Sequence, residues 1–133
     1  MWLDIHPEYE TEVRVTEKGT RKWIGDQLSR GKLIGLIVRT AGGEVVGSGC
    51  IWLREEQPRP TNMSLVVPYL MSMYTVKKFR RQGVASLIVN GALKWCREQK
   101  YDGIVLHASK RGMSVYEGLG FEPSNEMRFK FGK

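Results

Sequence analysis

The sequence predicts a mixed α/β fold in which a mostly antiparallel sheet is flanked by helices. Three observations predict it. Runs rich in β-branched and apolar residues occupy the middle of the chain, a long amphipathic stretch covers residues 82–100, and turns containing glycine or proline separate these runs. Along the chain the expected order is helix, three strands, helix, strand, helix and strand, which is typical of a layered α/β domain.

Length and composition are those of a soluble globular protein. At 133 residues the chain is expected to form one domain over residues 1–133, with 41% hydrophobic and 26% charged residues. No apolar run approaches the roughly 20 residues of a membrane span, and the first residues lack the pattern of a signal peptide. Cys50 and Cys96 show no CxxC spacing and no histidine close by in the sequence. We therefore expect two reduced thiols in a cytoplasmic protein, with no metal and no membrane partner.

The first half of the chain predicts a helix followed by a β-hairpin. Residues 20–30 place Trp23, Ile24 and Leu28 at helical spacing, and Gly31 follows as a stop. The charged segment before them, residues 8–18, predicts only a weak helix. Two β-rich runs come next, and the glycine-containing turn between them predicts antiparallel pairing. The strands are expected at 32–40 and 45–55, with the turn at 41–44 between them.

The second half predicts a loop, a third strand and two helices that enclose a short strand. Two prolines in the segment 56–62 suit neither a ladder nor a helix interior, so this segment is expected to be a loop. Pro68 is placed at the entrance of the third strand, where proline is tolerated. The remaining elements are expected at 68–76 (strand), 82–100 (helix), 101–109 (strand), 111–120 (helix) and 121–131 (last strand).

Basic residues surround the point where the third strand passes to the long helix. The first turn of a helix has N–H groups without intrahelical partners, and a phosphate placed there accepts several of them. Gly83 and Ala85 would allow close approach, and Arg80 and Arg81 are suited to phosphate oxygens. Two familiar phosphate loops, G-x-x-x-x-G-K-[ST] and G-x-G-x-x-G, are absent. The alternative from the residues alone is a solvated, charged turn.

The segment Arg80–Ala85 resembles the [QR]-x-x-G-x-[GA] motif of the GNAT superfamily of N-acetyltransferases. The strand before it, the helix after it, the strand "GIVLHAS" and the ending "VYEGLGF" follow that family's order over about residues 33–129. The resemblance implies a GNAT-like acyl-CoA N-acyltransferase fold with splayed central strands and acetyl-CoA as cosubstrate. It implies that the coenzyme contacts Met73, Thr75, Arg80, Arg81, Gln82, Gly83, Val84, Ala85, Ser86 and Ser109.

Tyr116 aligns with a tyrosine that in many members of the family protonates the departing thiolate. The chemistry is reasonable, because attack of a neutral amine on a thioester expels coenzyme A thiolate, and a phenol with a pKa of about 10 can give it a proton. The alternative is that Tyr116 only packs against the sheet. The resemblance therefore makes Tyr116 the predicted catalytic acid.

The sequence departs from the family pattern where many members carry a glutamate. The corresponding strand has Met71, Ser72 and Met73 and no carboxylate, so the motif does not identify the general base. Glu55, Glu56 and His107 are candidates, and loss of the amine proton to water is the remaining alternative. The family also opens with a strand and a helix, whereas only a marginal segment precedes Thr20. Either the native chain is longer or the first strand is missing.

Aromatic and methionine residues alternate along the predicted strands. Trp52, Tyr69, Met71 and Met73 would form an apolar wall for the acceptor, with the loop 56–62 as its lip. The alternative is ordinary core packing.

The expected function is transfer of an acetyl group from acetyl-CoA to a primary amine of a small molecule or peptide. A catalytically weak acyl-CoA-binding sensor of the same fold is the alternative. The net charge of +7 would also suit a nucleic-acid-binding domain, but basic residues are not interleaved with aromatic ones in a stripe, so no nucleic-acid partner is expected. Whether the chain forms a homodimer is left open.

Overall fold

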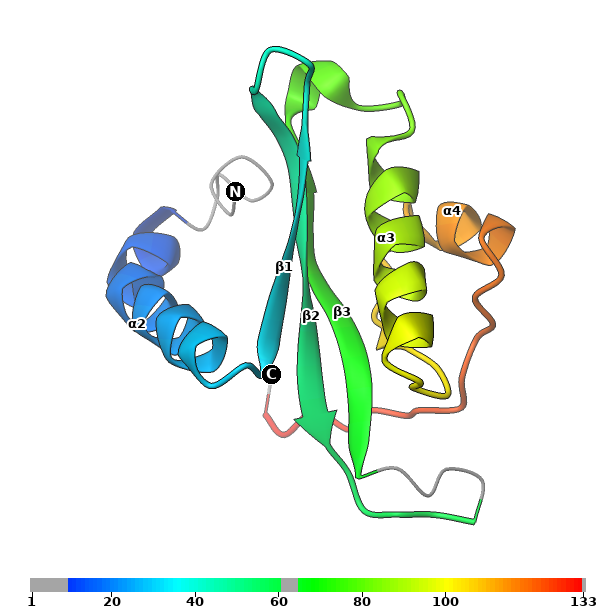
Figure 1. The fold of residues 1–133 in the computed structure, drawn as a ribbon. Coiled ribbons are helices and arrows are strands. Elements are labelled where there is room, and N and C mark those ends of the chain that lie inside the picture. The colour runs from blue at the N-terminus through cyan, green and yellow to red at the C-terminus, as the bar shows by residue number, and fades with distance from the viewer. Residues whose placement is uncertain (1–9, 61–64, 133) are drawn as a thin grey trace.

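The computed structural model describes residues 10–60 and 65–132 and shows a four-stranded sheet with helices on both faces (Figure 1). The strands lie in the order β1-β2-β3-β4. The helices α3 and α4 lie on one side of the sheet and α2 on the other. The elements are α2 (Glu10–Ser29), β1 (Leu33–Arg39), β2 (Val45–Glu55), β3 (Val66–Thr75), the short 3₁₀ helix η2 (Lys77–Phe79), α3 (Val84–Glu98), β4 (Val105–Leu106) and α4 (Met113–Gly118). The predicted mixed α/β class is confirmed.

Strands β1, β2 and β3 form an antiparallel meander, and β4 adds to it in parallel. The predicted turn at 41–44 closes the first hairpin. Thr40 N–H donates to the Glu44 carbonyl at 2.8 Å, and Gly43 adopts a positive φ of 90°, which favours glycine. The sheet is thus mostly antiparallel, as predicted.

A β-bulge interrupts β3 and reverses the direction of its side chains. Ser48 pairs with Tyr74 and Cys50 pairs with Met71, so β3 carries one extra residue opposite β2. Ser72, within the bulge, has a φ of 56°. As a consequence Met71 shares the α2 face with Cys50, whereas Met73 turns toward α3.

Met73 therefore packs against the core, which agrees with the core-packing alternative and not with a place in the acceptor wall. A Cβ atom built on Gly49 would lie 2.8 Å from the Met73 sulfur and 2.9 Å from Ile88 Cγ2 on α3. The prediction assumed unbroken period-two alternation from Tyr69 to Met73, and the extra residue in the bulge breaks it.

The hydrophobic core lies between the sheet and α3. The buried side of α3 consists of Val84, Ile88, Val89, Ala92 and Cys96. On the sheet, Ile51 and Leu70 are almost completely buried against this helix. The helix was predicted over 82–100 from its apolar period, and the structure confirms it within two residues at each end.

Glycines on β2 allow α3 to approach the sheet closely. A Cβ atom on Gly47 would stand 2.5 Å from Val84 Cγ1 and 3.2 Å from the Tyr74 carbonyl oxygen. Such distances are not tolerated, so the absence of a side chain at Gly47 lets the first residue of α3 rest directly on β2.

Helix α2 covers part of the opposite face of the sheet. It runs as one helix from Glu10 to Ser29, which covers most of the segment predicted at 20–30 and the described part of the weakly helical segment before it. Trp23 meets Trp52 edge to face at 5.7 Å, and Trp52 Nε1–H donates to Gln27 Oε1 at 3.3 Å. Gly31, with a φ of 68°, follows the helix as predicted.

Three predicted elements differ from the structure. The strand expected at 101–109 is reduced to Val105–Leu106, because only Tyr69 and Leu70 pair with it. Pro68 lies inside β3 rather than at its entrance, paired with Leu53. The last strand expected at 121–131 is absent, since residues 121–132 contain no strand and hydrogen-bond to no neighbouring strand.

Other predictions concern residues 1–9 and part of the loop 56–62, and these lie outside the described residues. In the part of the chain that the structure describes, no helix combines the length and apolarity needed to cross a bilayer.

The contact between Gly47 and Val84 leads to a prediction about stability. We expect Gly47→Ala to lower the free energy of unfolding by about 1–3 kcal/mol, because the new methyl group forces α3 away from β2. Chemical denaturation measures this change. Gly35→Ala is the matched control on β1, since its Cβ would meet nothing within 4 Å. Equal losses in both variants would contradict the role of the close approach.

Candidate functional site

The turn between β3 and α3 leaves the start of α3 open. Arg81 and Gly83 both have positive φ, 63° and 82°, and Gly83 is the N-cap. Among the described residues no side-chain hydrogen bond caps this helix end, and the first turn contains no acidic residue. Leu87 N–H donates to the Gly83 carbonyl at 3.0 Å, so the N–H groups of Val84, Ala85 and Ser86 precede the first intrahelical bond. This geometry suits an anion with several acceptor oxygens.

Positive charge gathers around the same turn. Lys77, Lys78, Arg80 and Arg81 are all exposed. Arg80 is partly committed to holding the turn, because its Nε–H donates to the Thr75 carbonyl at 3.0 Å and its guanidinium lies 5.8 Å from the Tyr74 ring centre. Gln82 likewise donates from its side chain to the Lys78 carbonyl at 3.2 Å. Arg81 is therefore the arginine best placed to face an anion.

Strands β3 and β4 separate just beyond their short pairing. The parallel ladder ends at Leu70 and Leu106, and the bulge at Ser72 follows on β3. From Met71 to Thr75, β3 pairs with β2 only. This stretch leads directly to the open start of α3. The splayed pair of strands that the sequence predicted is thus present.

Tyr116 lies on the α3 side of this opening. It belongs to α4, packs with Leu106 against the core under α3, and meets Phe121 edge to face at 5.9 Å. Burial raises the pKa of the Tyr116 phenol above its ordinary value, because the charged phenolate is poorly solvated there. The hydroxyl thus keeps its proton through neutral and mildly alkaline pH, as a proton donor requires.

His107 lies on the opposite, α2 side and contacts two other polar side chains. The Tyr69 hydroxyl and His107 Nδ1 are 2.7 Å apart, and His107 Nε2 is 3.6 Å from Glu126 Oε1. The arrangement favours the tautomer with the proton on Nε2, in which Nδ1 accepts from Tyr69 and Nε2–H faces the carboxylate. The sequence singled out Tyr69 and His107 separately but gave no sign that they meet.

A row of rings extends from His107 across this face. Tyr69 meets His107 at 5.2 Å between ring centres and Trp52 at 6.4 Å, both edge to face. Trp52 in turn meets Trp23 of α2. Arg54 lies 5.3 Å from the Tyr69 ring centre. Trp52 and Tyr69 therefore lie side by side on this face, together with Met71, and their role as a wall for the acceptor stays a prediction.

The two glutamates considered as bases are engaged elsewhere. Glu56 forms a 2.6 Å ion pair with Arg54, and the exposed Glu55 lies 3.8 Å from Lys32. Ser109, predicted to contact a coenzyme, accepts a hydrogen bond from Gly112 N–H at 3.1 Å and so helps to shape the start of α4.

Both cysteines are free, Cys96 buried and Cys50 half-buried, and burial raises the pKa of each thiol. Within residues 10–60 and 65–132, no three His, Cys, Asp or Glu side chains come close enough together to hold a metal ion.

A model of the acetyltransferase (GNAT) family matches residues 1–121. The chain belongs to the GNAT acetyltransferase family. Human N-acetyltransferase 8 is 23% identical over 94 residues, which are 60% of this chain and 41% of that protein. The chain thus spans less than half the length of that relative.

Solved structures agree on the fold. A GCN5-related N-acetyltransferase from Ralstonia eutropha JMP134 superposes with a TM-score of 0.83 at 22% identity, covering 91% of this chain and 79% of the other. A predicted acetyltransferase from Clostridium acetobutylicum, solved with acetyl-CoA, gives 0.79 at 23% identity, covering 87% and 75%. At these identities the likeness establishes the GNAT fold.

Proposed function

We propose that this GNAT protein transfers the acetyl group of acetyl-CoA to a primary amine of a small molecule or peptide. One observation carries the proposal. The uncapped start of α3, entered through Arg81 and Gly83, lies at the end of the stretch of β3 that pairs with β2 but no longer with β4. This stretch begins beside the Tyr69–His107 pair. A ligand with a diphosphate at one end and a thioester at the other fits this order of sites.

The chain's own groups would hold acetyl-CoA in two ways. The N–H groups from Arg81 to Ser86 would bind the diphosphate, with Arg81 as a charged donor. The main chain of β3 between Met73 and Thr75 would pair with the pantetheine arm as an added strand does. The Clostridium acetobutylicum relative was solved with acetyl-CoA, which supports the choice of ligand.

Acid and base would act from opposite faces of the opening between β3 and β4. Tyr116, on the α3 side, would give its proton to the thiolate as the C–S bond breaks. On the α2 side the Tyr69 hydroxyl would take the amine proton while passing its own to His107 Nδ1, and Glu126 would stabilise the imidazolium that results. This relay supplies the base that the sequence lacks at Met71–Met73.

The second candidate is an acyl-CoA-binding sensor without turnover, favoured only by the absence of a carboxylate on β3 at 71–73. Calorimetry with acetyl-CoA combined with thiol release over polyamines, amino acids, aminoglycosides and peptide N-termini separates the two. Binding without thiol release for every amine would support the sensor. We place the protein in the cytoplasm, where two free cysteines fit a reducing environment.

The first test concerns the diphosphate. Arg81→Glu should raise the Kd for acetyl-CoA by about 10–100-fold, since a charged hydrogen bond worth about 1.5–3 kcal/mol is lost and repulsion is added. Arginine and glutamate both carry a Cβ atom, so the positive φ at position 81 strains the backbone equally in the wild type and in the variant. Arg97→Glu, at the far end of α3, is the control. Isothermal titration calorimetry makes the comparison, and unchanged binding in Arg81→Glu would remove the proposed phosphate site.

The second test concerns the acid. Tyr116→Phe should lower kcat by about 10²-fold or more with little change in acetyl-CoA affinity. Because burial raises the pKa of Tyr116, the wild-type advantage should persist through neutral pH and shrink only when pH rises through that pKa. Steady-state thiol release over a pH series measures it. Equal turnover at every pH would exclude the acid role.

The third test concerns the relay. His107→Gln and Tyr69→Phe should each lower kcat near neutral pH by about 10–100-fold, and both should recover as pH rises, because the acceptor amine then loses its proton to solvent. Tyr101→Phe is the control, because Tyr101 stacks on Trp95 away from the relay. A loss that is independent of pH would indicate a structural role instead.

A further inference from the structure

Arg54, near the end of β2, is a cation that its own fold satisfies only in part. Its Nη2 donates to Glu56 Oε1 at 2.6 Å, and its guanidinium lies 5.3 Å from the Tyr69 ring centre. Its Nε–H is enclosed, yet it has no hydrogen-bond partner among the described residues. Buried donors without a partner are rare in folded proteins because they cost stability, so this arginine has donors to offer to a ligand.

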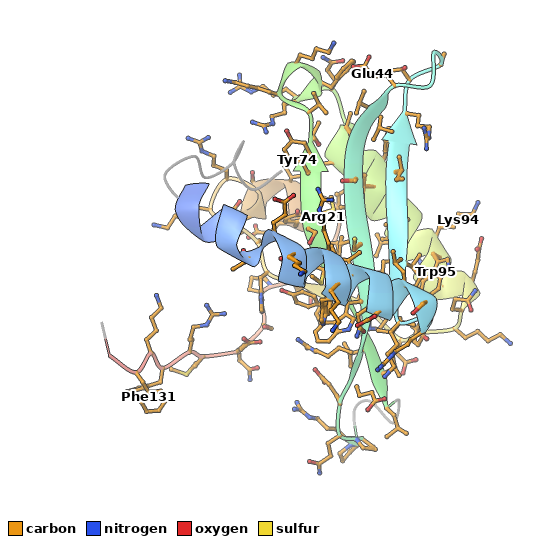
Figure 2. The ribbon with its side chains drawn as sticks, turned by 90° about the vertical axis from the view of Figure 1, so that its left-hand side faces the viewer. Arg21, Glu44, Tyr74, Lys94, Trp95 and Phe131 are labelled. Carbon is orange, nitrogen blue, oxygen red and sulfur yellow. The ribbon has the colours of Figure 1, made fainter. Side chains whose placement is uncertain are left out.

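Arg54 lies on the α2 face of the sheet, beside the row of rings. Trp52 precedes it by two residues on β2 and pairs with Tyr69 on β3, so the three side chains share this face. Figure 2 looks onto the same face and shows α2 lying across it, with the end of β2 extending beyond the helix. The Arg54 side chain is 29% exposed, so a small molecule can contact its guanidinium.

One tyrosine connects Arg54 to the proposed acid–base groups. Tyr69 places its ring beside Arg54 and its hydroxyl 2.7 Å from His107 Nδ1. An amine that gives its proton to this hydroxyl is thus only one aromatic ring away from the guanidinium. A molecule whose amine and anionic group are a few bonds apart can therefore contact both.

We propose that the acceptor is a free amino acid whose carboxylate binds Arg54, and that Glu56 occupies this arginine until the acceptor arrives. The inference rests on the proposed function, since it names the acceptor of that reaction. A guanidinium can form two parallel hydrogen bonds with a carboxylate, and Arg54 keeps donors that Glu56 does not use. Exchange of one carboxylate for another leaves the net charge of the site unchanged.

Glu56 can act in this way because its main chain is fixed while its side chain is not fully enclosed. The Glu56 N–H donates to the Leu65 carbonyl at 2.7 Å, which holds the two ends of the connection between β2 and β3 together. The Glu56 side chain is 29% exposed, so its carboxylate can turn toward solvent when another carboxylate binds. An ion pair that is partly open to water contributes little to stability, so this exchange costs little.

Charge and distance disfavour the other acceptors. Glu56 already balances the charge of Arg54, so a phosphate dianion would be repelled by this carboxylate. A polyamine has no anionic group for Arg54 and would approach a chain with a net charge of +7. In a peptide of more than a few residues, the terminal carboxylate lies too far from the terminal amine to reach the same arginine.

The first experiment compares amino acids with their amides, which keep the amine and lose the carboxylate. Glycine, L-leucine and L-phenylalanine are each paired with the amide, and kcat/KM is measured by thiol release. Arg54→Gln should lower the ratio of kcat/KM for amino acid over amide by about 10–100-fold, since charged hydrogen bonds are lost. Glu56→Gln should raise the same ratio by about 3–10-fold, since the competing carboxylate is removed. Lys32→Gln is the matched control, because Lys32 lies 3.8 Å from Glu55 in a neighbouring ion pair, and it should leave the ratio unchanged.

The opposite signs separate a binding role from a structural one. If Arg54 and Glu56 only stabilised the fold, both variants would change the ratio in the same direction or not at all, and this result would overturn the inference. Thermal unfolding checks that each variant is folded. Where Arg54→Gln does not fold, Glu56→Gln decides alone, because only the exchange of carboxylates predicts a gain.

Calorimetry with the same six compounds, with and without coenzyme A, tests binding in the absence of turnover. Each amino acid should bind to the wild type at least about tenfold more tightly than its amide. Amino acid binding without thiol release would keep the Arg54 site and remove the proposed reaction. Thiol release without any preference for amino acids over amides would keep the reaction and overturn the Arg54 site, and so would the failure of every amino acid to bind.

Discussion

The contact between Val84 and the bare backbone of Gly47 fixes where α3 begins. Because no side chain separates them, the helix start rests on β2 at the same level as the last residues of β3. The segment between β3 and α3 must therefore reverse the direction of the chain within a few residues. Positive φ at Arg81 and Gly83 makes this tight turn possible. That conformation points successive N–H groups outward rather than into a side-chain cap. The proposed anion site would thus be a consequence of close helix–sheet packing more than of any one basic residue.

The second constraint is the bulge at Ser72. An antiparallel strand without it would present Tyr69, Met71 and Met73 on one face and would continue to pair along both edges. The extra residue sends Met73 into the core and frees β3 from β4 beyond Leu70. A non-glycine residue at a φ of 56° is a local strain of about 1–3 kcal/mol, which the packing of Met73 against Gly49 and Ile88 helps to offset. The bulge also lies where the pairing of β3 with β4 ends, beside the opening that the proposed reaction would use.

The features of the structure that depend on a short stretch of sequence could be predicted from it. The period of Val84, Ile88 and Ala92 predicts α3, and glycines at 42–43 predict the first hairpin turn. The motif around Gly83 and the ending around Tyr116 predict the family. The bulge was not predictable, because serine carries no preference for positive φ that could mark it. The Tyr69–His107 contact depends on which strands become neighbours, and this information is not local. The last strand expected at 121–131 is absent, because alternation along the chain cannot specify the neighbouring strand that pairing requires.

The positive charge of the chain can be understood through the same geometry. Of its net +7, the residues Lys77, Lys78, Arg80 and Arg81 lie within five positions of one another beside the start of α3. Lys78 forms an ion pair with Glu44 at 3.5 Å, and both side chains are more than half exposed. Exposed pairs contribute little to stability, so a cluster of this kind acts mainly on approaching charges. The cluster thus favours encounter with an anion, while the uncapped N–H groups behind it hold the anion once it arrives. Salt screens the attraction between the exposed cluster and an approaching anion beyond a Debye length of about 8–10 Å, but it hardly affects hydrogen bonds made at contact. The association rate should therefore depend more on salt concentration than the dissociation rate does.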